Sequence, residues 1–309
     1  TQDDYHGLAA LFAKLDRGKS IRYIGRGEVS HPATGEAARP KLPGDRFLDA
    51  EGDHRPALAQ WLTADENSQF SCAIANRLWA AMMGRGLVEP LDDFRATNPP
   101  THSVLLNRLA DTLADGGYDL RKTLRLIATS AAYARSSSTT RNNEDDRTYY
   151  SHALRTPHSA EVLMDAIGDV TGVPVEFDQK TDRRAIALAG PASPVAELAL
   201  LGQCDRKSGC NAASQANSIA RELALLNGAL LNTRINAPQG RLTGLLANRK
   251  SNDGIVREMY LRALSRRPTE RETKFWRGQL ATEIVDERRR RLEDFVWSIL
   301  RCHEFTHRY

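Results

Sequence analysis

The chain has 309 residues, of which 41% are hydrophobic and 27% charged, so it is long enough to bury a substantial core as one large domain or two small ones. Lys and Arg number 43 against 39 Asp and Glu, and the net charge of +4, the interspersed acid and the 6% of aromatic residues predict no nucleic-acid partner. No apolar run is long enough for a membrane span, so we expect none.

The first fifty or so residues differ in composition from the rest of the chain. Residues 5–16 predict a short helix, whereas residues 21–54 are rich in Gly and Pro with few β-formers. The first residues lack the basic-then-apolar order of a signal peptide. We therefore expect residues 1–20 to be the tail of a preceding domain, with any targeting signal upstream. Residues 21–54 are expected to form a linker with at most a small hairpin.

A helical period dominates residues 55–309, which we expect to form a helical domain. Pro56 suits a first helical turn, and the next helix, from Ser68, can end at Gly84 in a left-handed cap. One face of that helix carries an apolar stripe at helical spacing, which we predict to be buried: Phe70, Ile74, Leu78 and Met82.

Two further helices are predicted before a polar tract. Thr101 or Ser103 can begin the first, which ends at the glycine pair 116–117, and Asp119 is the expected N-cap of the second. The second helix has four apolar residues at helical spacing: Leu120, Leu124, Ile127 and Ala131. The tract at about 136–152 is rich in Ser, Asn and Asp, and we expect it to be a polar surface loop.

The rest of the sequence returns to helical patterns. One helix follows His158, residues 172–211 are irregular, and the last third predicts four or five helices. The chain shows no repeat of fixed period, so a solenoid is not expected. The sequence therefore predicts a mainly α fold, an irregular multi-helix domain with a short N-terminal loop or hairpin segment.

Three carboxylates follow a double-glycine turn and form the first candidate site: Glu89, Asp92 and Asp93. Carboxylates on a loop beside a glycine turn are what glycoside hydrolysis or calcium binding would use. Adjacent residues tend to point apart, however, so Asp92 and Asp93 are not expected to be the acid and base of one site. The alternative is structural ion pairs with arginines that are close in sequence: Arg77, Arg85 and Arg95.

His158, Glu161 and Asp165 form a second candidate, because spacings of three and four bring side chains together on one helix face. Such a set can bind a divalent cation or act as a general acid and base. The opposite face carries the predicted buried stripe: Leu163, Ile167 and Val170. The alternative is a solvated polar face, or ion pairs with Arg155 or another helix.

Residues 303–307 match H-E-x-x-H, in which two imidazoles one helical turn apart bind zinc and a glutamate acts as the base. Only two residues follow His307 to hold the second ligand, and Phe295 and Ile299 share a stripe with both histidines. We therefore interpret the histidines as an extension of the packing face and predict no metal. Motifs for covalent haem, dinucleotides and phosphate loops are absent, so we predict no cofactor.

The sequence contains four cysteines. Cys204 and Cys210 lie in a polar, glycine-containing loop, where closing a small ring is geometrically easy, and we expect a disulfide there in an oxidising compartment. Two free surface thiols are the alternative. Cys72 and Cys302 lie on predicted helices, and the sequence leaves open whether they pair or remain two buried thiols.

Three segments together carry a resemblance to a known family: NRLWAAMMGRGLVEPLDDF from Asn76, DLRKTLRLIATSAAYARSS from Asp119, and LEDFVWSILRCHEF near the end. They resemble a planctomycete-specific domain of unknown function. That domain usually follows another planctomycete-specific domain, and often a cytochrome c-like domain, in secreted multidomain proteins. The resemblance runs over nearly the whole chain and implies no established activity.

The resemblance implies an extracytoplasmic location, periplasmic or secreted. It also implies that the chain packs against the preceding domain of the same polypeptide and perhaps against a cytochrome c-like domain. Its pattern covers most of the residues that we choose as candidates for binding: Asn76, Arg77, Trp79, Glu89, Asp92, Asp93, Glu161 and Asp165.

Two functions follow from these observations, and the sequence leaves open whether the protein is an enzyme. The first is a binding or scaffold module of a cytochrome-associated multidomain protein. The second is a hydrolase or binder of extracellular polysaccharide that uses the loop carboxylates. Carboxylates with raised pKa values in a cleft would favour the second, and carboxylates occupied by arginine would favour the first.

Overall fold

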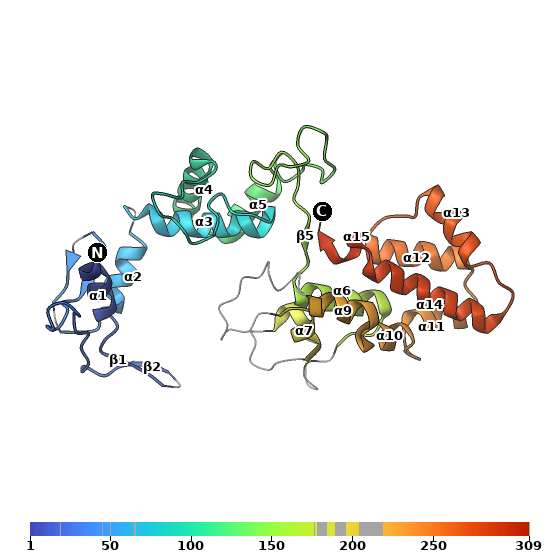
Figure 1. Ribbon diagram of the computed structural model, residues 1–309, viewed down its shortest axis with the longest axis horizontal. Coiled ribbons are helices and arrows are strands. Elements are labelled where there is room, and N and C mark those ends of the chain that lie inside the picture. Colours follow the sequence, from blue (N-terminus) through green and yellow to red (C-terminus); the bar gives the residue numbers. More distant parts are fainter. Residues whose placement is uncertain are drawn as a thin grey trace. The chain divides into compact units, whose positions relative to one another are not determined.

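The computed structural model describes the chain except at residues 19, 45, 50, 65, 176, 178–183, 189–195, 204–218 and 309 (Figure 1). Its contacts divide it into two compact units. Unit 1 contains residues 1–135 and 139–153, and unit 2 contains residues 136–138 and 154–309. Helices are the main regular structure, and the strands in the described ranges form only two-stranded sheets, so the predicted mainly α fold is confirmed. The domain limits expected from the sequence stay predictions.

Unit 1 begins with a helix and two short hairpins. Helix α1 (Gln2–Ala10) packs against β3 (Lys41–Leu42), which pairs with β4 (Arg46–Phe47). Strands β1 (Leu15–Arg17) and β2 (Ile21–Tyr23) form the other antiparallel hairpin. The helix predicted at 5–16 is therefore wrong at its C-terminal end, because the chain turns after Ala10 and enters β1.

The central helices of unit 1 begin and end at the residues that local chemistry favours. Helix α2 (Arg55–Leu62) has Pro56 in its first turn, where a missing N–H costs nothing. Helix α3 (Ser68–Met83) ends at Gly84, whose φ of 83° is the left-handed conformation that glycine adopts without steric penalty. The predicted cap at Gly84 is confirmed.

Helices α4 (Ser103–Asp115) and α5 (Leu120–Ala128) pack against α3. Asp119 caps α5 as predicted, with its side chain accepting from the Lys122 N–H at 3.1 Å. The N-cap of α4 is His102 and not Thr101 or Ser103, because the His102 imidazole accepts from the Leu105 N–H at 3.3 Å. Helix α5 ends at Ala128, earlier than the apolar spacing through Ala131 predicted.

The core of unit 1 shows that the predicted stripe on α3 is wrong. The stripe residues are only partly buried, whereas the fully buried face is turned by about one residue and includes small and polar side chains: Ser71, Cys72, Ala75, Asn76, Trp79 and Met83. This face packs against Leu106 and Leu109 of α4 and Ile127 of α5. The buried face was missed because periodicity counts apolar residues, and Asn76 is not one.

Unit 2 is built from helices around α6 (Ala160–Thr171), with one small antiparallel pair, β5 (Thr156–Pro157) and β6 (His307–Arg308). Its other described elements are η1 (Ala185–Ala187), α7 (Ala196–Leu200), α9 (Ile219–Asn227), α10 (Ala229–Ile235), α11 (Arg241–Ala247), α12 (Asn252–Leu264), α13 (Glu270–Gln279), α14 (Val285–Arg301) and α15 (His303–Thr306).

The core of unit 2 lies where α6, α12 and α14 meet. Leu163 and Ile167 of α6 are 0% exposed, as the predicted stripe requires, and they join Ile255 of α12 and Phe295 of α14 in one apolar cluster. Burying each such side chain contributes roughly 1.5–3 kcal/mol. In the described part of the chain, none of the helices combines the length and the apolar character that a membrane span requires.

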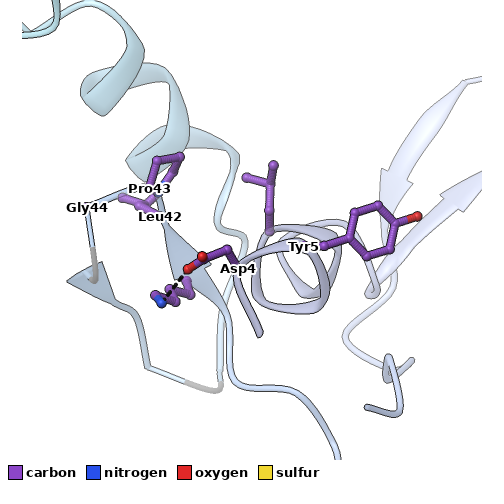
Figure 2. A pocket seen from close by; sticks show the side chains of 7 residues that line it. Asp4, Tyr5, Leu42, Pro43 and Gly44 are labelled. Atoms are coloured by element: carbon purple, nitrogen blue, oxygen red, sulfur yellow. Dashed lines mark hydrogen bonds and ion pairs between the residues drawn. The ribbon is translucent and has the colours of Figure 1, made fainter. Parts of the chain in front are cut away.

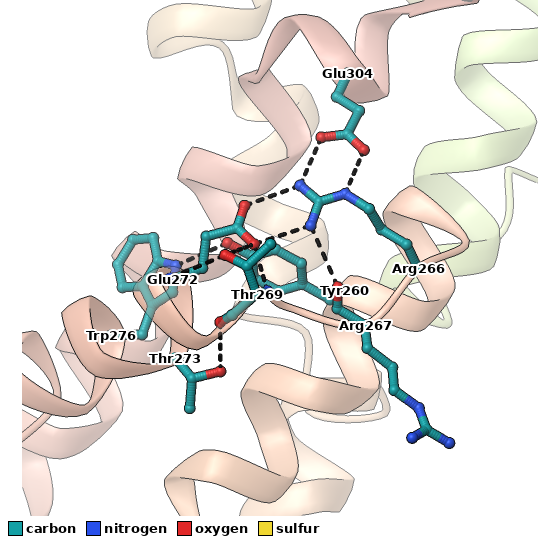
Figure 3. A network of polar contacts seen from close by, with 8 residues as sticks. All are labelled: Tyr260, Arg266, Arg267, Thr269, Glu272, Thr273, Trp276 and Glu304. Carbon is teal, nitrogen blue, oxygen red and sulfur yellow. Dashed lines mark hydrogen bonds and ion pairs between the residues drawn. The ribbon is translucent and has the colours of Figure 1, made fainter.

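A polar network fastens α12, α13 and α15 to one another (Figure 3). Arg266 forms two-pronged pairs with Glu272, at 2.8 and 2.9 Å, and with Glu304, at 2.6 and 2.8 Å. Beside it, the Trp276 indole N–H donates to the Tyr260 hydroxyl at 3.1 Å. One guanidinium thus joins two segments that are 32 residues apart in sequence, from Glu272 to Glu304.

Candidate functional site

Asn76 holds the segment that carries the candidate carboxylates, residues 85–102, which we call the acidic loop. Its side-chain N–H groups donate to the Val88 carbonyl at 2.9 Å and the Leu91 carbonyl at 3.0 Å, and its Oδ1 accepts from the Val88 N–H at 3.0 Å. Asn76 is 0% exposed, and a polar side chain is buried at low cost only when its hydrogen bonds are made. Asn76 therefore faces the backbone of the loop and fixes its path.

Gly86 allows the acidic loop to pass close to that clamp. A Cβ at this position would lie 2.4 Å from the Val88 carbonyl oxygen and 3.0 Å from Asn76 Nδ2. The Tyr150 hydroxyl, from a distant part of the sequence, lies 2.6 Å from the Gly86 carbonyl oxygen and 3.1 Å from that of Arg85. The loop is therefore fixed from both sides, by Asn76 and by Tyr150.

The three carboxylates of the acidic loop have separate partners. Arg77 donates to both oxygens of Asp92 at 2.7 Å, and Arg95 donates to Asp93 at 2.5 and 2.6 Å. The Arg95 guanidinium lowers the pKa of Asp93. Glu89 Oε2 accepts from the Gly86 N–H at 3.1 Å. The loop thus contains structural ion pairs with Arg77 and Arg95, as the alternative interpretation predicted, whereas Arg85 forms no ion pair with these carboxylates among the described residues.

A pocket of about 160 Å³ lies beside the acidic loop, between its end and the aromatic residues that follow α5. Among the residues that line it are three aromatic side chains and three polar ones: Trp79, Tyr149, Tyr150, Thr101, His102 and Arg135. The Tyr149 side chain is 75% exposed, whereas Trp79 is 3% exposed. We call this the Trp79 pocket.

Trp79 lines this pocket, and its indole N–H is buried. The rings of Trp79 and Tyr150 meet edge to face, with their centroids 5.4 Å apart. Burial raises the pKa of the Tyr150 hydroxyl, and the nearby indole N–H opposes that shift. The indole N–H nevertheless reaches hydrogen-bond geometry with no acceptor in the described part of the chain. A ligand that supplies an acceptor for such a buried donor therefore binds more favourably.

Glu161 and Asp165 lie on α6 in unit 2 and also have structural partners. Glu161 Oε1 accepts from the Gln203 side chain at 3.1 Å. Asp165 accepts from the N–H groups of Ala185 at 2.8 Å and Ile186 at 3.2 Å, and so caps the short helix η1. Both carboxylates therefore accept hydrogen bonds from neighbouring groups of unit 2.

His158 does not share a helix face with them, which corrects the predicted three-residue set. The N-cap of α6 is Ser159, so His158 lies before the helix, and its N–H donates to the Thr306 carbonyl at 3.0 Å. Burial lowers the pKa of His158, and Arg221 and Arg308 act in the same direction. The backbone pairing of β5 with β6 therefore determines the position of His158.

The H-E-x-x-H segment is not one continuous helix. Helix α14 ends at Arg301, and Cys302 has extended backbone (ψ 150°), so His303 begins the separate helix α15 and His307 lies in β6. Glu304, which would be the base, is paired with Arg266 (Figure 3). Among the residues that the structure describes, no group of three or more His, Cys, Asp or Glu side chains could hold a metal ion.

Cys72 and Cys302 are free cysteines, so no disulfide joins them. Burial raises the pKa of both thiols. Cys204 and Cys210 lie outside the described residues, and their expected disulfide stays a prediction.

Another pocket, of about 420 Å³, lies beside α1 and the loop between β3 and β4 (Figure 2). Asp4 and Tyr5 of α1 line one side, and Lys41, Leu42 and Pro43 line the other. Lys41 Nζ donates to Asp4 Oδ1 at 2.6 Å, and this hydrogen bond is the main cause of a lowered pKa at Asp4. The acid and the base of this pocket are thus already paired with each other.

Sequence reasoning missed the residues that complete the Trp79 pocket. His102, Arg135 and Tyr150 are far apart in sequence. They meet because α4 packs against α3 and the Tyr150 ring contacts the Trp79 ring of α3. One signal could have found Tyr149 and Tyr150, since two adjacent tyrosines stand out in a tract that is otherwise rich in Ser, Asn and Asp.

These features define a mainly α-helical protein in which loop carboxylates serve as structural partners and a small aromatic pocket lies beside them. Residues 54–280 match the model of the PSD1 family, described as a protein of unknown function (DUF1553). This match covers well over half of the chain, so the chain belongs to that family. Neither the curated proteins nor the solved structures gave a match.

Proposed function

We propose that the protein is a non-catalytic binding or assembly module of an extracytoplasmic multidomain protein from planctomycetes. It would pack against the domain that precedes it and against a cytochrome c-like domain. The resemblance of its three signature segments supports this context. The main support for a binding role is that the candidate carboxylates are already paired with arginines or hydrogen-bonded to neighbouring groups.

Hydrolysis of a glycosidic bond needs one carboxyl group that keeps its proton near neutral pH and a second that is free to act as base or nucleophile. Arg95 lowers the pKa of Asp93, which is the opposite of what a general acid requires. Asp92 is held by both of its oxygens on Arg77. These two carboxylates are therefore poor candidates for catalysis, which favours a binding role over hydrolysis.

The size of the Trp79 pocket narrows what it can bind. Pockets for drug-sized ligands measure about 300–1,000 Å³, whereas this one measures about 160 Å³. It can accommodate one side chain of a partner protein or one sugar ring. We propose that it receives a single anchor side chain from the partner domain, with an acceptor for the Trp79 N–H, because buried anchor side chains dominate protein interfaces.

The test is binding of the 309-residue chain to the separately produced preceding domain and cytochrome c-like domain, measured by calorimetry. Tyr149→Ala removes a ring that lines the pocket and is 75% exposed, so the fold should tolerate it. Tyr133→Ala is the matched control, because Tyr133 is 42% exposed and does not line the pocket. Binding that Tyr149→Ala weakens at least tenfold and Tyr133→Ala leaves unchanged supports the proposal. If the chain binds neither the preceding domain nor the cytochrome c-like domain, the proposal is contradicted.

A binder of extracellular polysaccharide is the second candidate, and the exposed Tyr149 ring beside Arg135 and His102 favours it. Aromatic rings flanked by a few hydrogen-bonding groups are common in ligand sites. Affinity electrophoresis through glycan-containing gels, with the same two tyrosine variants, tests this role. Release of reducing sugar that Asp93→Asn abolishes would restore the hydrolase hypothesis.

The compartment can be tested independently through the cysteines. Peptide mapping without reductant, on protein from an oxidising host, should find a bridge between Cys204 and Cys210 if the protein is built for an extracytoplasmic location. Free thiols at both positions would count against that location.

A further inference from the structure

The Trp79 pocket lies at the N-terminal end of helix α4. Thr101, His102 and Leu105 line it, and His102 is the N-cap of α4. The first backbone N–H groups of a helix have no partner within it, so this end carries a partial positive charge that attracts anions. The first turn of α4 contains no acidic residue to neutralise that charge. The pocket therefore borders a helix end that favours a negatively charged ligand.

Arg135 adds a full positive charge to the same lining. Its Nη1 donates to the Tyr150 carbonyl, which holds the guanidinium in place and leaves its other N–H groups for a further partner. Among the residues that the structure describes, no carboxylate lies within ion-pairing distance of Arg135, and none lines the pocket. Beyond the lining, Arg85 and Glu89 also act on Tyr150, whose pKa burial raises, and their effects are opposite. The charges around the pocket therefore leave an excess of positive charge.

Two residues of the lining also carry hydrogen-bond donors without an acceptor. The buried Trp79 indole N–H has none in the described part of the chain. His102 Nδ1 accepts from the Leu105 N–H at 3.3 Å, so the ring carries its proton on Nε2, which is a second donor. A ligand that only accepts hydrogen bonds suits such a lining better than one that must also donate.

The remaining walls of the pocket are apolar and consist of Leu87, Leu105 and Ala132. A carboxylate on a short aliphatic stem matches this combination, because the carboxylate only accepts hydrogen bonds and the methylene groups can contact the apolar walls. A neutral sugar matches it less well, because each of its hydroxyl groups also needs an acceptor. The volume of about 160 Å³ suits a single group of this kind.

We propose that the Trp79 pocket binds a carboxylate, and that the anchor which the partner domain inserts is an acidic side chain, glutamate or aspartate. The carboxylate would lie between Arg135, His102 and the first turn of α4. Arginine suits it because planar N–H groups match the two oxygens of a carboxylate. This inference rests on the binding role proposed above and adds the chemistry of the group that the pocket recognises.

Titration of the isotope-labelled 309-residue chain with N-acetyl-glutamate amide, followed by NMR, tests the proposal. N-acetyl-glutamine amide is the matched neutral ligand, because the two compounds differ in one charged group. The four tryptophans give four indole signals, and Trp79→Phe identifies the one from Trp79. At constant ionic strength, we expect that signal to shift with a Kd of roughly 1–10 mM for the glutamate compound, as suits so small a ligand, and with a Kd about tenfold higher for the glutamine compound.

Variants test whether the charge of Arg135 is responsible. Arg135→Gln should raise the Kd for the glutamate compound about fivefold and leave that for the glutamine compound nearly unchanged, since only the first ligand is charged. Arg141→Gln is the matched control, because it makes the same change of charge at an exposed position that does not line the pocket. Unchanged indole signals from the other three tryptophans would show that each variant keeps its fold.

Three outcomes would overturn the proposal. The first is no shift of the Trp79 signal at about 100 mM of the glutamate compound, well above the expected Kd. The second is an equal Kd for the two compounds, and the third is equal weakening by Arg135→Gln and Arg141→Gln. Tighter binding of glucuronate than of the glutamate compound would assign the pocket to acidic sugars and overturn the choice of a protein side chain.

The titration uses the chain alone, so its result is separate from the binding of the partner domains. A glutamate-specific shift without binding of either domain would leave the carboxylate site in place while the proposed function fails. Binding of a domain without any preference for the glutamate compound would refute the carboxylate site and leave the proposed function in place.

Discussion

Replacing Asn76 with alanine should destabilise unit 1 more than any exposed substitution nearby. The change removes three hydrogen bonds and leaves the Val88 N–H and the carbonyls of Val88 and Leu91 without their partner. Because Asn76 is 0% exposed, water does not readily replace it. At roughly 1 kcal/mol net for each hydrogen bond, the free energy of unfolding should fall by about 3 kcal/mol. This is a large part of the roughly 5–15 kcal/mol that stabilises a typical domain.

Hydrogen exchange followed by mass spectrometry measures this effect at the loop itself. The Val88 amide donates to Asn76 Oδ1 in the folded protein, so its exchange reports whether the clamp is closed. A loss of about 3 kcal/mol corresponds to roughly 100-fold faster exchange when the exchange rate follows the opening equilibrium. Urea unfolding followed by far-ultraviolet circular dichroism should show an earlier transition for unit 1.

Arg77→Gln is the matched control, one residue further along α3. Its ion pair with Asp92 is solvent-exposed, with side-chain exposures of 58% and 68%, and exposed pairs contribute little to stability. The control should therefore unfold and exchange almost like the wild type. If Asn76→Ala behaves like Arg77→Gln, the acidic loop is held by other contacts and our account of the clamp is wrong.

The sequence predicted local features of the fold well, because these features depend on neighbouring residues. The left-handed cap at Gly84 and the N-cap at Asp119 were both predicted. The structure shows another local signal of this kind at Thr269, which begins α13 with a capping box closed by Glu272. Such signals involve hydrogen bonds across three or four residues, so the sequence alone contains both partners.

The buried face of α3 could not be predicted in the same way. Asn76 is buried because its partners Val88 and Leu91 return to it 12 and 15 residues later, and no periodic pattern of apolar residues encodes that return. The break at Cys302 was missed for a related reason. The pairing of β6 with β5, on residues about 150 positions earlier, favours an extended chain where the local pattern continues a helix.

The candidate site was predicted in part. The arginines near the acidic loop were expected to neutralise its carboxylates, and Arg77 and Arg95 do so. Other contacts depend instead on side chains brought together from distant segments, such as Tyr150 at the Gly86 carbonyl and Arg221 at the His158 carbonyl. The sequence shows that these residues exist, but only the packing of helices shows what they surround.

Three further predictions test the same physical reasoning. Gly86→Ala should open the acidic loop and lower the thermal unfolding temperature, since its Cβ would lie 2.4 Å from a backbone oxygen; an unchanged temperature would show that the loop can shift at low cost. Burial raises the pKa of Cys72 and Cys302, so both should react with a maleimide at pH 8 roughly tenfold more slowly than in urea, as followed on their separate peptides. Rapid labelling in the native protein would show that they are accessible. Arg266 lowers the pKa of Glu272 to about 2, so the stability that this pair contributes is complete above the ordinary pKa of 4.5 and is lost as the pH falls towards 2. Urea unfolding should therefore show that the wild type loses on the order of 1 kcal/mol more than Glu272→Gln between about pH 6 and pH 2, a figure reduced for solvent screening of a pair that is partly exposed. Equal losses in the two proteins would mean that the Arg266 network positions α13 and α15 without stabilising them.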